Sequence, residues 1–244
     1  VKLKCVQSKG FKLYIFESFK PFEEALKDHI EQFDNVYKVV NVLPVMPVIA
    51  GQERELPFSS IESLIDYAET NGLSLGVLGL IYEQYRSGLS QEVLKDKMKN
   101  IIEIIEGSIA KGLSGTKYED RLLPQQSNLV AKAEQRGKIL QGSIINKIIE
   151  NVAAIMESKS ALEVIVANPT AGSCVTVGAA LKAVSDEVEA TMEDKIMAYY
   201  AAGLVGAYFA MGPGFSAEEH GCQVECGASA GMAAAGIVQF FGGT

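Results

Sequence analysis

The sequence has no tryptophan and no excess of basic residues. Its 22 Lys and Arg against 30 Asp and Glu leave a formal net charge of -8, which argues against a surface that follows nucleic-acid phosphates. We therefore expect a small-molecule substrate or a protein partner, and no nucleic acid. The 23 glycines, the missing tryptophan and a hydrophobic fraction of 48% predict a compact, Ala/Gly-rich helical protein.

The sequence also lacks a long uninterrupted apolar run. The longest, Ile196 to Met211, is broken by Gly203 and Gly206, whereas a membrane-spanning helix needs about 20 apolar residues. This run predicts a buried central helix, and no membrane association. No charged segment followed by an apolar one opens the chain, which predicts a cytoplasmic location. In that compartment four cysteines indicate metal binding or reactivity before disulfides.

Residues 1–58 differ in pattern from the rest and predict a small α/β lead segment of unknown role. Phe11 to Phe16 alternates as a strand does, and Phe22 to Phe33 carries a helical apolar stripe. Val36 to Leu43 is rich in valine, which predicts a second strand. Four residues then punctuate a linker: Pro44, Pro47, Gly51 and Pro57.

Residues 59–244 predict a helical bundle, so the fold class is mainly α. Ser59 with Glu62 forms a capping box, Ser90 caps a longer helix that ends at Gly112, and Thr191 with Asp194 starts the central helix. The apolar stripes predict inward faces that include these residues of the first, third and fourth helices: Ile61, Leu64, Ile65 and Ala68; Val93, Leu94, Met98, Ile101, Ile102, Ile105 and Ile109; Ile145, Ile148, Ile149 and Ile155. Six or seven helices follow one another without β-α alternation, so a parallel sheet is not expected.

Two loops interrupt the predicted bundle, and loops commonly carry chemistry. The second, Val166 to Gly178, contains Asn-Pro-Thr-Ala-Gly-Ser-Cys from Asn168 to Cys174. Backbone N–H groups on a glycine-bearing turn and two hydroxyls suit the binding of a carboxylate. The alternative is an ordinary turn with local hydroxyl caps.

The stretch Gly221 to Gly227, Gly-Cys-Gln-Val-Glu-Cys-Gly, precedes a helix of small residues. A helix N-terminus favours thiolate, the form that binds metal. With Met232 to Ala235, this stretch resembles the cluster-binding motif of the alpha chain of iron-sulfur-dependent L-serine dehydratases. The Pro-Thr-Ala-Gly-Ser segment resembles a second motif of that family, although Val175 stands where the family commonly has glycine.

The resemblance implies that Cys222 binds a 4Fe-4S cluster and that Thr170, Gly172 and Ser173 hold a small amino-acid substrate. The other loop, Gly112 to Ser127, resembles a version found in one branch of the family, and its Arg121 suits a substrate carboxylate because guanidinium binds carboxylate bidentately. The alternative is an exposed charged loop with local ion pairs. The implied reaction converts L-serine to pyruvate and ammonia by dehydration and deamination. No residue is assigned as the catalytic base.

Two further cluster cysteines of the family would lie beyond Thr244, so the resemblance covers the front portion of the family's domain. It also implies a beta chain or domain as partner, and small-residue helix faces permit a homo-oligomer. The alternatives are a truncated or degenerate relative that binds small molecules or partners without a cluster, and a related lyase that acts on another small amino acid such as cysteine.

Two alternatives remain open around Cys222. Cys222 and Cys226 can share a helix face and form a two-thiol metal site, for which a zinc ion would need two more ligands, with His220 and Cys174 as candidates. The second concerns three residues just upstream, Glu218, Glu219 and His220. One hypothesis is that they orient substrate or relay a proton, and the other is that they form a solvated cluster at the entry to the helix.

Overall fold

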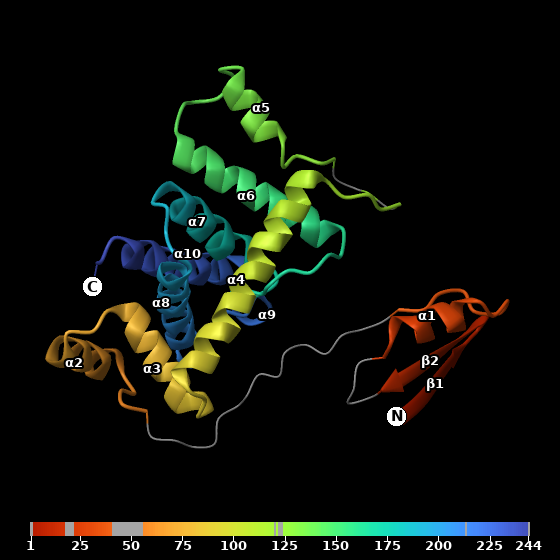
Figure 1. Cartoon of the computed structure of the whole chain (residues 1–244), viewed down its shortest axis with the longest axis horizontal. Helices are drawn as coiled ribbons and strands as arrows, with labels where there is room; N and C mark the ends of the chain where they lie inside the picture. The colour runs from red at the N-terminus through yellow and green to blue at the C-terminus, as the bar shows by residue number, and fades with distance from the viewer. Residues whose placement is uncertain are drawn as a thin grey trace. The chain divides into compact units, whose positions relative to one another are not determined.

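The computed structural model describes residues 2–17, 22–40, 56–119, 121, 124–212 and 214–243. The chain divides into two compact units, Val1–Ile49 and Ala50–Thr244. The described residues are mostly helical, and the strands among them form a single two-stranded sheet near the N-terminus (Figure 1). The mainly α fold class is therefore confirmed, while the predicted boundary at residues 58 and 59 stays a prediction.

The first unit contains a β-hairpin and one helix. Strands β1 (Lys2–Ser8) and β2 (Phe11–Glu17) pair antiparallel, with Ser8 opposite Phe11. Gly10 in the turn has φ +103°, which glycine adopts without strain. Helix α1 (Glu24–Glu31) follows. The strand at Phe11 to Phe16 and the helix within Phe22 to Phe33 are thus confirmed.

The strand predicted at Val36 to Leu43 is wrong for residues 36–40, which have no strand pairing, and residues 41–43 lie outside the described residues. Valine content predicts only that a segment fits a pleated surface. A strand also has to pair with a neighbouring edge, and residues 36–40 pair with no other described segment.

The second unit consists of helices joined by loops. Its described helices are α2 (Ile61–Asn71), α3 (Leu75–Ser87), α4 (Gln91–Ser114), α5 (Leu129–Gln135), α6 (Ser143–Ser160), α7 (Cys174–Glu187), α8 (Met192–Met211), α9 (Ala217–His220) and α10 (Cys222–Phe240). They are more numerous than the predicted six or seven because α5 and α9 are short. No described residue after residue 60 forms a strand, which confirms the expected lack of β-α alternation.

Local side chains fix where these helices begin. Thr191 and Asp194 form the predicted capping box of α8, and Ser90 caps α4 as predicted. The capping box predicted from Ser59 is wrong by one residue, because Ser60 accepts the N–H of Ser63, whose hydroxyl accepts in return. Helix α4 also continues past Gly112 to Ser114, so its predicted end is two residues early.

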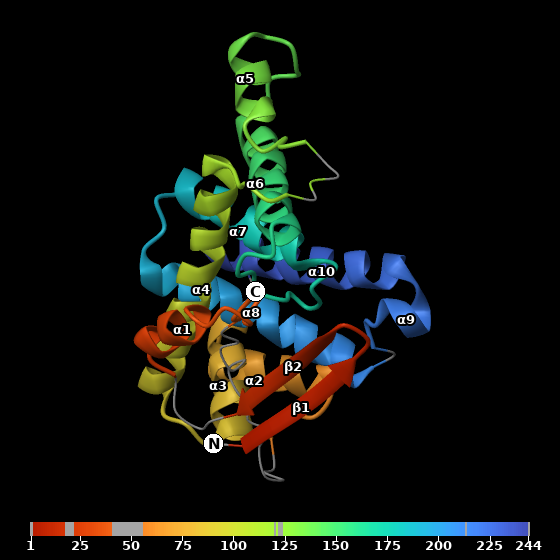
Figure 2. The same cartoon turned by 90° about the vertical axis from the view of Figure 1, so that its right-hand side faces the viewer.

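Helix α8 is the centre of the helical unit, with α3 and α10 packed along it and α4 and α7 also in contact (Figures 1 and 2). Close approach depends on small residues. A Cβ added to Gly79 of α3 would lie 2.3 Å from the Tyr200 carbonyl oxygen of α8. The Tyr200 hydroxyl donates to the Leu94 carbonyl at 2.7 Å and so satisfies a buried polar group. The predicted buried central helix is confirmed, and none of the described helices combines the length and apolarity needed to cross a membrane.

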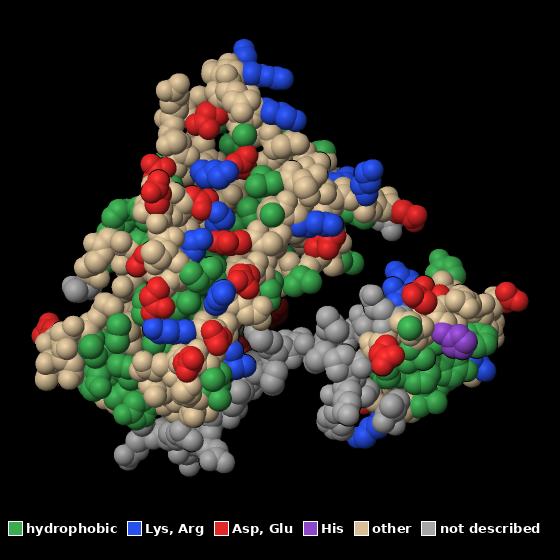
Figure 3. Space-filling view, in the orientation of Figure 1, with side chains coloured by type: hydrophobic (Ala, Val, Ile, Leu, Met, Phe, Trp, Pro, Cys, Tyr) green, Lys and Arg blue, Asp and Glu red, His purple; other side chains and the backbone are tan. Residues whose placement is uncertain are grey.

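Charged side chains of both signs alternate on the face of the helical unit seen in Figure 3, and no continuous basic surface lies on that face of the described residues. Lys95 pairs with Glu193 and Lys195 with Glu106, which joins α4 to α8. The expectation that the chain does not follow nucleic-acid phosphates stays a prediction.

Three predicted apolar faces are wrong in part. Ile61 and Ile65 of α2 are exposed, as are Val93 of α4 and Ile145 and Ile149 of α6. Helix α6 instead buries a largely polar face: Asn146, Glu150, Asn151, Ala154, Ile155, Glu157 and Ser158. Its rotation follows from these polar contacts. The Ser158 hydroxyl, for example, donates to the Ser108 carbonyl of α4 at 2.6 Å.

Candidate functional site

The loop before α7 is held by its own hydroxyl groups. The Ser173 N–H donates to the Thr170 hydroxyl at 3.2 Å, and the two hydroxyl oxygens lie 3.1 Å apart. The Asn168 N–H donates to the Thr170 carbonyl at 3.1 Å, and the Asn168-Pro169 bond is cis. Ser173 is buried and immediately precedes the first residue of α7. The loop therefore presents two hydroxyls at a helix N-terminus, where N–H groups favour an anion.

The second element of the site is the first turn of α10. Gly221 has φ +87°, in the region that favours glycine, and the helix begins at the next residue, Cys222. Cys222 is exposed. The predicted loop-to-helix junction is confirmed, and the thiol lies at the first residue of the helix.

These two segments, far apart in the sequence, contact each other through Gly172 and Glu225. A Cβ added to Gly172 would lie 2.6 Å from Oε2 of Glu225 and 3.2 Å from its Cδ. Glu225 is half-buried on α10, three residues after Cys222. The contact brings the loop of Thr170, Gly172 and Ser173 against the helical turn that bears Cys222.

Glu225 was not among the residues predicted from the sequence. A signal for it was present, because residues three apart on a helix share a face, and Glu225 is three residues beyond Cys222. Recognising its relation to Gly172 required the packing of α10 against the loop before α7.

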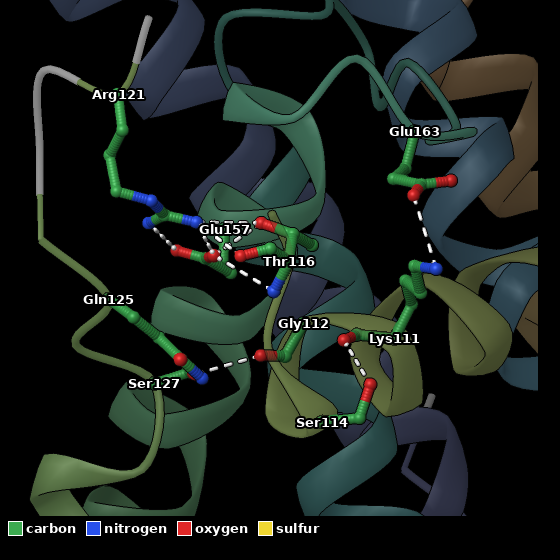
Figure 4. A network of polar contacts seen from close by, with 9 residues as sticks. All are labelled: Lys111, Gly112, Ser114, Thr116, Arg121, Gln125, Ser127, Glu157 and Glu163. Atoms are coloured by element: carbon green, nitrogen blue, oxygen red, sulfur yellow. Dashed lines mark hydrogen bonds and ion pairs between the residues drawn. The ribbon is translucent and has the colours of Figure 1, made fainter. Parts of the chain in front are cut away.

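Arg121 is held by Glu157 of α6 in a bidentate ion pair (Figure 4). Its Nη1 donates to Oε2 at 3.1 Å and its Nη2 donates to Oε1 at 2.6 Å. Nη2 also reaches the Thr116 carbonyl at 2.7 Å, and the Thr116 hydroxyl donates to Glu157. The Tyr118 ring lies 4.4 Å from the guanidinium carbon. This pair is not local, since it ties the loop after α4 to a distant helix.

The Arg121 contacts therefore give that side chain a structural role, and its binding of a substrate carboxylate stays a prediction. The Glu157 carboxylate is almost fully buried, with its side chain 6% exposed, so it depends on Arg121 and Thr116 for its hydrogen bonds. The hydrogen bond from Arg121 lowers the pKa of Glu157, and hydrogen bonds from Thr116 lower it further. Burial acts in the opposite direction and raises it, but the hydrogen bonds outweigh it.

We expect the free energy of unfolding to fall on acidification, because protonation of Glu157 breaks its ion pair with Arg121. A carboxyl whose pKa is lowered by folding stabilises the fold fully above its unfolded pKa of 4.5 and loses that contribution as pH falls through the folded pKa. Glu157→Gln should cost about 2 kcal/mol at pH 7, because a charge-assisted hydrogen bond is lost. Urea unfolding between pH 3 and pH 7 should show the difference between the two proteins shrinking as the pH falls below 4.5; a constant difference over that range would contradict the assignment.

The remaining cysteines do not complete a metal site. Cys174 is buried at the start of α7, and burial raises the pKa of its thiol, with Lys159 acting in the opposite direction. Cys226 is exposed on α10 and Cys5 is exposed on β1. Among the described residues no group of three His, Cys, Asp or Glu could hold a metal ion. The zinc site considered for Cys222, Cys226, His220 and Cys174 is therefore not formed.

The same observation tests the fit of a 4Fe-4S cluster. Such clusters are normally held by several Cys thiolates, and the described part of the chain brings only Cys222, with Cys226 one turn later, to this surface. The residues present do not fit a complete cluster. Cys222 fits a single ligand position, since it is exposed at a helix N-terminus.

The acidic residues upstream of Cys222 are solvated. Glu218 accepts a hydrogen bond from the Ser216 hydroxyl at 2.7 Å, and this lowers the pKa of Glu218. His220 Nε2 lies 3.7 Å from a Glu219 carboxylate oxygen, and the side chains of Glu218, Glu219 and His220 are exposed. These positions favour a solvated cluster at the helix entry.

Comparison with known proteins assigns the family. Residues 26–244 match the family model described as serine dehydratase alpha chain. The chain belongs to the serine dehydratase alpha chain family. The match leaves the β1–β2 hairpin outside it and includes the loop before α7 and the first turn of α10.

Three relatives of this family have related sequences. The chain is 29% identical to a probable L-serine dehydratase alpha chain of Bacillus subtilis and 26% identical to an L-serine dehydratase alpha chain of Peptoniphilus asaccharolyticus, over 77% and 76% of its length. It is 27% identical to L-serine dehydratase 1 of Escherichia coli, over 77% of its length. It spans 62%, 64% and 42% of these three proteins.

Proposed function

We propose that this chain is part of an L-serine dehydratase, an enzyme that converts L-serine to pyruvate and ammonia. The observation that carries the proposal is the contact between the loop before α7 and the first turn of α10, made by Gly172 and Glu225. It joins the two segments whose sequences resemble the family's substrate and cluster motifs. Membership of the serine dehydratase alpha chain family supports the same conclusion.

In this proposal the loop binds the carboxylate of the amino acid. The Thr170 and Ser173 hydroxyls lie 3.1 Å apart, next to the N-terminus of α7, where N–H groups favour an anion. Gly172 lets the backbone approach closely because it has no side chain. Arg121 is a second candidate for the carboxylate and would first have to release Glu157.

The reaction removes the proton on Cα and the hydroxyl on Cβ, which leaves as water. The resulting aminoacrylate hydrolyses to pyruvate and ammonia. We assign binding and orientation to Thr170, Gly172 and Ser173, and we propose Cys222 as one thiolate ligand of a 4Fe-4S cluster. No side chain is assigned as the base.

The proposal also covers partners and location. A relative named as an alpha chain implies a beta chain, and we propose one as partner here. Four cysteines without a disulfide agree with a cytoplasmic location. Release of pyruvate from serine would serve amino-acid degradation and gluconeogenesis. A homo-oligomer stays a prediction.

Pyruvate release tests the proposal directly. The purified chain should release pyruvate from L-serine after anaerobic treatment with iron, sulfide and excess dithiothreitol, whose thiolates complete the ligand set, with and without a beta chain. Ser173→Ala should raise the KM for serine about tenfold, since one hydrogen bond to the carboxylate is lost, whereas Ser114→Ala, an exposed hydroxyl at the end of α4, should leave it unchanged. Release of pyruvate from L-cysteine but not from L-serine would indicate a different lyase. No pyruvate from L-serine, with or without the beta chain, would reject the proposal.

A further inference from the structure

We propose that Glu225 binds the ammonium group of the amino-acid substrate, an inference that rests on the proposed function. Together with the loop at Thr170 and Ser173, it would give the site one group for each charged end of an amino acid. The assignment concerns a residue that neither the motif resemblance nor the family match singles out.

The first observation is the position of the carboxylate. Its Oε2 lies so close to the Gly172 backbone that any side chain at position 172 would collide with it, because an added Cβ would be 2.6 Å away. The carboxylate therefore lies against the same loop that presents the Thr170 and Ser173 hydroxyls. It also lies on the helical turn that begins with Cys222.

The second observation is that this carboxylate has no partner in the described part of the chain. Among the described residues, every other acidic side chain that is not exposed has a hydrogen-bond or ion-pair partner. The partners are Arg86 for Glu83, Lys195 for Glu106, Asn146 for Glu134, Lys147 for Glu150 and Arg121 for Glu157. Glu225 makes no hydrogen bond or ion pair with any described residue, although it is half-buried.

A half-buried carboxylate without a partner loses hydration and gains nothing in return. A ligand cation would restore the missing interaction, and charge-assisted hydrogen bonds between ammonium and carboxylate are among the stronger ones. An amino acid carries such a cation on the carbon next to its carboxylate. With the carboxylate at the loop and the ammonium at Glu225, the Cα between them is fixed at two points.

This arrangement predicts discrimination between amino acids and hydroxy acids. L-Glycerate has the carboxylate and β-hydroxyl of L-serine, with a hydroxyl in place of the ammonium. Calorimetric titration of the full chain, without iron so that no turnover occurs, should show tighter binding of L-serine than of L-glycerate. Glu225→Gln, which keeps the shape of the side chain, should weaken L-serine binding about tenfold and leave L-glycerate binding within about twofold of the original value.

Two further variants separate binding from folding. Gly172→Ala should displace the carboxylate and weaken L-serine binding, while Glu92→Gln, which alters an exposed acid in the first turn of α4, should change neither titration. Unchanged L-serine affinity in Glu225→Gln would overturn the role of Glu225 and leave the proposed function intact. Failure of the unmodified chain to bind either ligand would reject the substrate site itself, and the inference with it.

Discussion

Replacing Gly112 by alanine is expected to lower the free energy of unfolding by about 3 kcal/mol, at the upper end of the usual cost of overpacking. A Cβ at this position would lie 1.8 Å from the Ala154 carbonyl oxygen and 2.5 Å from its carbon. Both atoms belong to the backbone of α6 and cannot rotate away, so α4 and α6 would have to separate. The gain in helix propensity, about 1 kcal/mol, offsets only part of this cost.

Gly107 of the same helix provides the matched control. It is exposed, and nothing lies within 4 Å of an added Cβ. Gly107→Ala should therefore raise the free energy of unfolding by up to about 1 kcal/mol. Urea unfolding of the two variants should shift the midpoint in opposite directions, and equal midpoints for Gly112→Ala and the unmodified chain would contradict the close approach of α4 to α6.

The consequence of separating these helices would extend to the polar network in Figure 4. The Gly112 carbonyl accepts a hydrogen bond from the fully buried Ser127 hydroxyl at 2.8 Å, and Glu157 lies on α6 three residues after Ala154. The loop that carries Arg121 is thus attached to α4 through Ser127 and to α6 through Glu157. We expect Gly112→Ala to weaken the Arg121–Glu157 pair as well.

Local sequence signals predicted the helix ends and the central helix well. Ser90 and the Thr191–Asp194 box are recognisable because a cap acts on N–H groups only two or three residues away. Helix α8 was recognisable because it is apolar on all sides, so its rotation about its axis did not need to be known. The box at Ser59 was misplaced because Ser60 offers an equivalent cap and Ser63 supports it.

The orientation of α6 was not predictable from its apolar stripe. Ile145 and Ile149 are exposed, while Glu157 and Ser158 point into the unit. The partners that make these polar residues stable inside, Arg121 and the Ser108 carbonyl, come from distant parts of the chain. A periodic pattern identifies a face, but hydrogen-bond partners decide whether a polar face can be buried.

In the candidate site, too, local features were predictable from the sequence and contacts between distant segments were not. Short motifs marked Thr170, Ser173 and Cys222, since each motif lies within one continuous segment. The contact of Gly172 with Glu225 joins two segments that the sequence does not relate, and so Glu225 emerged only from the packing of α10 against the loop before α7. Motifs locate chemistry along the chain, whereas the fold determines which chemical groups meet.

Cys222→Ser is expected to abolish iron binding at this site. The thiol is exposed at the first residue of α10, and Cys thiolates are the usual protein ligands of iron-sulfur clusters. Anaerobic reconstitution with ferrous iron, sulfide and excess dithiothreitol provides small thiolates that complete the ligand set. The iron content per chain and the thiolate-to-iron charge-transfer absorption should both fall at least about tenfold in the serine variant, because a hydroxyl is a much weaker ligand for iron than a thiolate.

Cys226→Ser is the matched control, since this second exposed thiol lies on the same helix, past its first residue. It should retain the iron content of the unmodified chain if Cys222 alone anchors the iron. Equal loss in both variants would indicate a two-thiol site instead. Full iron content in Cys222→Ser would overturn the ligand assignment. An unmodified chain that binds no iron would reject the cluster part of the proposed function. The substrate site would then still be tested separately by the Glu225 titrations.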